Sequence, residues 1–147
     1  MLSMFDVGTR EKFRKRIGNL TPRSERRWGT MSSQKMICHL GDQIRLALGE
    51  LDARPIPGAM HYAPMRWLAL YVLPWPHGFK GPPEAFTTQA GEWERDISAL
   101  DSLLEQFAAH SHQREWPDHP VFGAMSGSVW AKFTCKHFDH HLRQFGV

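Results

Sequence analysis

The chain has 147 residues, of which 41% are hydrophobic and 22% are charged, and its formal net charge is +3 at pH 7. These values are typical of an ordinary soluble globular protein, and we expect a single domain over residues 1–147. They exclude a membrane-spanning chain, because the longest apolar run, residues 67–73, is far shorter than the ~20 residues that a bilayer requires.

The first predicted helix covers about residues 5–20, where Phe13 and Ile17 lie at helical spacing between basic residues. Pro22 ends it, because proline disfavours a helical conformation in the preceding residue. Much of the positive charge lies in or just after this segment, at Arg10, Lys12, Arg14, Lys15, Arg16, Arg23, Arg26 and Arg27. We interpret it as a solvated helix face. A phosphate-binding surface is the alternative, but interleaved aromatic residues and any nucleic-acid motif are missing.

A second helix is predicted to begin at Ser32 or Ser33, whose hydroxyl can cap the free N–H groups of the first turn. Gly49 is the expected terminator. Within this helix His39 shares one broad face with apolar residues and with Gln43, so we expect its ring to point into the protein.

Residues 50–64 contain three prolines and are expected to form a loop. The almost wholly apolar segment 65–73 is either a short buried helix or a strand, and a helix fits the rest of the chain better. Residues 74–83 form a long irregular stretch, and loops of this length in a small domain often have a function.

The third long helix is predicted over about residues 91–109, and the last one starts after Ser126 and runs to about Phe145, with Gly146 placed to end it. A loop rich in His, Pro and Gly, residues 110–125, joins them. No alternating strand pattern appears. We therefore expect an all-α fold, a four-helix bundle with extended loops and a long crossover connection.

The last helix carries candidate metal ligands, because His137 and His141 lie four residues apart and therefore on one face. The same stripe includes Trp130 and Gln144, which indicates that the pair faces the interior. His39, on the inner face of the second helix, is the best candidate for a third ligand. Three neutral imidazoles can hold one divalent ion and leave a position open for water or substrate.

Neighbouring polar residues are assigned supporting roles. Gln144 shares the ligand face and is a candidate for orienting a ligand ring from outside. Asp42, one turn after His39, is a second candidate, with an exposed helical acid as the alternative. His140 has basic neighbours on its helix face, so we expect it to point outward.

Several rings can line the approach to the metal, although core packing is the alternative for each. These rings are Trp75, Trp93, Trp130 and His119. Cys38 and Cys135 are expected to be buried free thiols, because no secretory signal is visible and the cytoplasm, the expected compartment, is reducing. The aromatic residues of segment 62–86 could support a homodimer.

Several motifs occur in order along the chain. They are Leu20-Thr21-Pro22, Trp28-Gly29-x-Met31, Met36-x-x-His39-Leu40, Pro74-Trp75-Pro76, His119-Pro120-x-Phe122-Gly123 and His137-x-x-x-His141-x-x-Gln144. Together they resemble the DinB-like superfamily, in an uncharacterised DUF1569-type branch. This resemblance implies a four-helix bundle with a central divalent metal ion held by His39, His137 and His141. One departure is that the superfamily often ends His-Arg-Gly-Gln, where this chain has His141-Leu142-Arg143-Gln144.

The resemblance also implies chemistry, since characterised relatives include metal-dependent thiol transferases and a thiol-dependent isomerase. An ion on three neutral ligands would lower the pKa of a bound thiol or water, so thiol transfer and hydrolysis both follow. We therefore expect a metal-dependent enzyme of one of these types that uses Zn, Ni or Fe and takes a small molecule such as a low-molecular-weight thiol. A non-catalytic metal- or ligand-binding module is the alternative.

Overall fold

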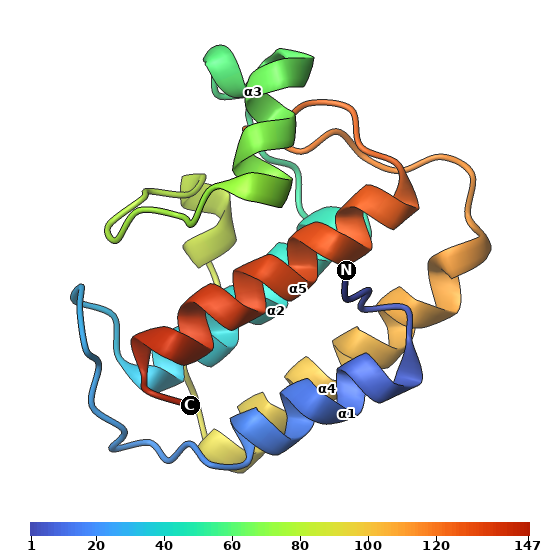
Figure 1. The fold of residues 1–147 in the computed structure, drawn as a ribbon. Helices are drawn as coiled ribbons and strands as arrows, with labels where there is room; N and C mark the ends of the chain where they lie inside the picture. The colour runs from blue at the N-terminus through green and yellow to red at the C-terminus, as the bar shows by residue number, and fades with distance from the viewer.

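The computed structural model describes all residues from 1 to 147 and is all-helical (Figure 1). Its long helices surround one hydrophobic core and are α1 (Val7–Ile17), α2 (Ser33–Ala47), α4 (Trp93–Ala109) and α5 (Gly127–Gln144). The all-α prediction is therefore confirmed. Each predicted long helix is present, with ends close to the expected residues.

The ends of α2 and α5 follow the local sequence signals. The Ser32 hydroxyl accepts a hydrogen bond from the backbone N–H of Lys35 at 3.2 Å and caps α2. Gly49 has a φ of 75° and ends α2 with the two backbone hydrogen bonds of a Schellman motif. Gly146, with a φ of 80°, ends α5 in the same way. Residues near each end thus determine how far these two helices extend.

The helix α2 lies centrally, in contact with both α4 and α5, and α1 packs against α5 (Figure 1). The helices α2 and α5 run antiparallel, because Gln43, one turn after His39, bonds to Thr134, which precedes His137 on α5. Large rings fill the space between the helices. The largest fully buried side chains are Trp130, Phe107 and Phe138.

The arginines of α1 pair with acids of neighbouring helices, so the prediction of a solvated basic face is wrong for them. Arg10 is buried and donates to Glu105 of α4 at 3.0 Å and to two backbone carbonyls. Arg14 pairs with the same carboxylate, and Arg16 pairs with Asp139 of α5 at 2.8 Å. These ion pairs hold α1 against α4 and α5 and leave less positive charge free for a phosphate.

The apolar segment 65–73, whose pattern fitted either a helix or a strand, is helical. The helix α3 (Ala63–Trp67) continues into a π-helical turn, η2 (Leu68–Val72). Several of its apolar side chains are exposed, so the expectation of a buried helix is only partly correct. Lys136 of α5 donates to the carbonyl oxygens of Ala69 at 2.7 Å and Leu73 at 2.6 Å. These bonds anchor the segment beside α5.

The loops contain three short 3-10 turns, which are η1 (Ala59–His61), η3 (Pro83–Phe86) and η4 (His110–His112). An isolated antiparallel bridge joins His119 to Gly123 in the loop before α5. No helix has both the length and the apolar composition that crossing a bilayer requires.

Candidate metal centre

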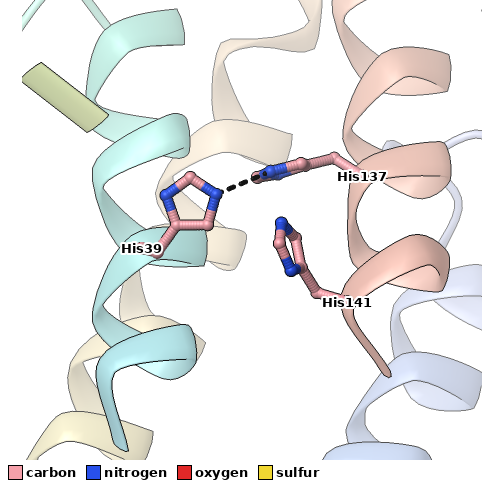
Figure 2. A group of neighbouring side chains, drawn as sticks. All are labelled: His39, His137 and His141. Carbon is pink, nitrogen blue, oxygen red and sulfur yellow. Dashed lines mark hydrogen bonds between the residues drawn. The ribbon is translucent and has the colours of Figure 1, made fainter. Parts of the chain in front are cut away.

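The three predicted ligands lie together, with His39 on α2 facing His137 and His141 on α5 (Figure 2). One ligand-capable nitrogen from each ring lies within 4.8 Å of the other two. The ring centroids are 4.7, 4.8 and 4.7 Å apart, and the ring planes meet at 79°, 82° and 90°. The ring planes are thus nearly perpendicular, and nitrogens of all three rings converge on one small region, as the ligands of a shared cation must.

Hydrogen bonds on two of the rings determine which nitrogen is free to coordinate. His39 Nδ1–H donates to the carbonyl oxygen of Ala85 at 2.7 Å, and His141 Nδ1–H donates to Gln144 Oε1 at 2.9 Å. The Nε2 lone pairs of both rings are therefore directed into the cluster. Metal-ligating histidines usually have an outer acceptor of this kind on the second nitrogen.

The His137 ring completes the cluster. Its Nε2 lies 2.9 Å from His39 Nε2, and its buried Nδ1 has no hydrogen-bond partner. One proton shared between His137 and His39 leaves the lone pair of His141 Nε2 without a partner, whereas a cation would satisfy all three Nε2 atoms. Tetrahedral coordination with bonds of about 2.0–2.1 Å places ligand nitrogens about 3.3 Å apart. That spacing lies between the 2.9 Å contact and the 4.8 Å limit, so the residues fit a divalent ion.

Burial keeps these rings neutral, which is the form in which imidazole binds a metal. Desolvation lowers the pKa of His39 to about 4 and that of His141 to about 3. It also lowers the pKa of His137 well below the usual value, with the nearby imidazoles adding to the effect. None of the three rings therefore has to lose a proton to bind an ion at neutral pH.

Asp42 makes no hydrogen bond to a ligand ring, so its predicted role of accepting from a ligand N–H is wrong, and so is the alternative of an exposed acid. It is 0% exposed and accepts hydrogen bonds from the backbone N–H and the hydroxyl of Thr88. These bonds fasten the segment around η3 to α2, where Ala85 accepts from His39 and Phe86 stacks on the same ring at 4.1 Å. Asp42 therefore positions the loop that supplies the outer acceptor.

Gln144 connects the cluster to the loop that precedes α2. Its Oε1 accepts from His141, and its Nε2 donates to the carbonyl oxygen of Trp28 at 2.9 Å. Gly29 comes next, with a φ of 76°, and a Cβ atom there would lie 2.8 Å from Gln144 Nε2. Only glycine suits this position, because of both its backbone conformation and the close approach.

The histidine cluster lines a pocket of about 520 Å³ bounded by α2, α5 and the loops that precede α2, α4 and α5. Trp75 and His119 are part of its lining. Trp130 and Trp93 are not, which corrects the prediction for both. Trp130 is fully buried in the core, and Trp93 lines a separate cleft beside α1.

His140 also lines the pocket, so the expectation that it points outward is wrong. Its ring lies 5.9 Å from Trp28 and 5.8 Å from Trp75, measured between centroids. Trp28 stacks on His77 at 3.9 Å with an angle of 5° between the planes, which joins two loops at the pocket. Trp28 and His77 were not predicted from the sequence, because both lie in loops where residue spacing carries no signal for contact.

Both cysteines are free and buried, as predicted. Desolvation raises the pKa of Cys38 to about 11 and that of Cys135 to about 12. Neither residue lines the pocket, and neither is a thiolate at neutral pH. Any thiol chemistry in the pocket must therefore use a thiol from a bound molecule.

Part of the chain is similar to a known protein family. The model of a family described as "Protein of unknown function (DUF1569)" matches residues 76–146. Searches among curated proteins and among solved structures gave no significant match. The matched region contains His137, His141 and Gln144 but not α2, which carries His39. Residues 76–146 of this chain are therefore similar to a family of uncharacterised proteins.

Proposed function

We propose that this protein is a DinB-like, divalent metal-binding enzyme that acts on a small molecule, as a thiol transferase or a hydrolase. The observation that carries the proposal is the convergence of three neutral imidazole rings on the wall of one pocket. The position of His39 on the second long helix, with His137 and His141 on the last, supports membership of the DinB-like superfamily.

A divalent ion on three neutral ligands keeps its full charge and lowers the pKa of a coordinated thiol or water, which is the chemistry of thiol transfer and hydrolysis. The chain supplies the positioning. Ala85 and Gln144 keep two ligand rings in the tautomer that binds a metal through Nε2. The rings of Trp75, Phe86 and Phe133 line the pocket and provide apolar walls for a ligand. Zinc, nickel and iron all accept imidazole ligands.

Metal binding is tested by elemental analysis of the purified chain after exposure to zinc, nickel or ferrous ions and removal of the excess. We expect about one equivalent of metal, bound through three protein ligands. His137→Ala should reduce it to background. His112→Ala is the matched control, because that imidazole is exposed and has no hydrogen-bond partner, and it should keep the full equivalent. Circular dichroism checks that both variants fold. A His137→Ala chain that keeps its metal would contradict the proposal.

Catalysis is tested separately with a low-molecular-weight thiol plus a panel of electrophiles, and with activated esters and amides. Turnover that is lost on chelation and in His137→Ala, but not in His112→Ala, supports the enzyme. Metal binding without turnover on either panel favours a non-catalytic binding module instead.

A further inference from the structure

Gln43 lines the pocket one turn beyond His39 and carries a buried oxygen without a partner. The residue is 3% exposed, and its Nε2 donates to Thr134 Oγ1 at 3.2 Å. The Thr134 hydroxyl proton is committed to the carbonyl of Trp130 at 2.8 Å, so towards Gln43 this hydroxyl can only accept. The amide orientation is therefore determined. It leaves Gln43 Oε1 as a buried acceptor with no hydrogen bond in the chain.

His119 lines the same pocket and offers a hydrogen-bond donor where Gln43 offers an acceptor. The residue is 5% exposed, and its Nδ1 accepts from the backbone N–H groups of Val121 at 3.0 Å and Phe122 at 3.3 Å. A nitrogen that accepts carries no proton, so the neutral ring has its proton on Nε2. No group of the chain accepts a hydrogen bond from this N–H. Burial lowers the pKa of His119 to about 3, which keeps the ring neutral.

Both groups contact neighbouring residues near the middle of α5. Gln43 is bonded to Thr134, and the His119 ring packs against the preceding residue, Phe133, at 4.6 Å. The one lysine or arginine in the pocket lining is Lys80, which comes from a different loop. An anion here could accept from the N–H of His119 but would leave the oxygen of Gln43 without a donor, and a cation could pair with that oxygen but would leave the N–H of His119 without an acceptor. Only a group that both donates and accepts satisfies both.

We propose that Gln43 and His119 form a recognition point for an uncharged ligand group that both donates and accepts hydrogen bonds, such as a carboxamide or a hydroxyl. The ligand donates to Gln43 Oε1 and accepts from His119 Nε2–H. Gln43 lies four residues after His39 on α2, a rise of about 6 Å. One small molecule can therefore reach this point and the histidine cluster together. That this molecule is a substrate rests on the proposed function. Its binding to Gln43 and His119 does not require a metal.

The test uses the full-length, isotopically labelled, metal-free chain, so that no probe can bind through an ion. Benzamide and benzyl alcohol are titrated against benzoate and benzylammonium, which have the same ring but carry a charge. We expect the two uncharged probes to shift the amide signals of Val121 and Phe122 and the side-chain NH2 signals of Gln43, with saturation. The charged probes should bind about tenfold more weakly or not at all.

Two variants make the test specific. Gln43→Leu removes the acceptor while retaining most of the volume, and it should weaken benzamide binding about tenfold. Gln106→Leu makes the same change at an exposed glutamine of α4 outside the pocket and should have no effect. His119 is not substituted, because its Nδ1 also orders its own loop.

Three results would overturn the inference. They are wild-type affinity for benzamide in Gln43→Leu, equal binding of charged and uncharged probes, and no shift at these signals with either uncharged probe. Metal stoichiometry of Gln43→Leu is measured in parallel and should equal that of the wild type. A chain that binds no metal would refute the proposed function but leave this binding test intact.

Discussion

Replacing Gln144 with methionine keeps a side chain of similar length but removes its hydrogen bonds to His141 and to the carbonyl of Trp28. The His141 ring then loses the acceptor that keeps its proton on Nδ1, so its Nε2 is no longer held ready to coordinate. Outer partners of this kind typically contribute about 10–100-fold to metal affinity. We therefore expect the Kd for zinc to rise by about 10–100-fold in Gln144→Met.

The same substitution should lower the stability of the metal-free chain. Loss of two hydrogen bonds at a largely buried position corresponds to about 2 kcal/mol of unfolding free energy. For a domain of this size that is a decrease in Tm of about 4–8 °C. Competition with a chromophoric zinc chelator measures the Kd, and calorimetry with excess chelator measures the Tm.

Gln106→Met is the matched control, because it makes the same chemical change at an exposed glutamine of α4 that donates to Glu50. It should leave both quantities near their wild-type values. If Gln144→Met binds zinc as tightly as the wild type while its Tm falls, Gln144 acts only in folding, and the reasoning about His141 is refuted. An unchanged Tm would mean that the two hydrogen bonds contribute nothing to the stability of the metal-free chain.

Two further perturbations test the surroundings of the cluster. Gly29→Ala forces a left-handed backbone on alanine and places its Cβ 2.8 Å from Gln144 Nε2. The free energy of unfolding, measured in urea, should therefore be about 1–2 kcal/mol lower than that of the wild type. Gly58→Ala, with open space around its Cβ, should change the unfolding free energy little; equal effects of the two would contradict the strain argument. Lowering the pH from 6.5 to 5.5 should destabilise the metal-free chain by about 1 kcal/mol each for His39 and His141, because their lowered pKa values keep them neutral when folded while the unfolded chain takes up protons. Urea titrations at the two pH values measure this loss, and an unfolding free energy that does not fall with pH would disprove it.

The sequence alone was sufficient for the long helices and for the pairing of two ligands. Capping by Ser32 and termination by Gly49 and Gly146 depend on residues within one turn of the helix end. His137 and His141 share a face because helical geometry requires it at a spacing of four residues. These features are local, so the pattern of residue types contains the information that determines them.

The surroundings of the histidine cluster depend on long-range packing. The outer acceptor for His39 is the backbone carbonyl of Ala85, 46 residues away. Asp42 bonds to Thr88 in the loop that contains Ala85, and not to the His39 ring. In the same way, the unpaired oxygen of Gln43 and the unpaired N–H of His119 emerge only once α2, α5 and the loop before α5 have packed together. A sequence pattern does not reveal which backbone carbonyl accepts a hydrogen bond or which polar atom has no partner. The position of such a group depends on how distant segments pack against each other, which no local periodicity encodes.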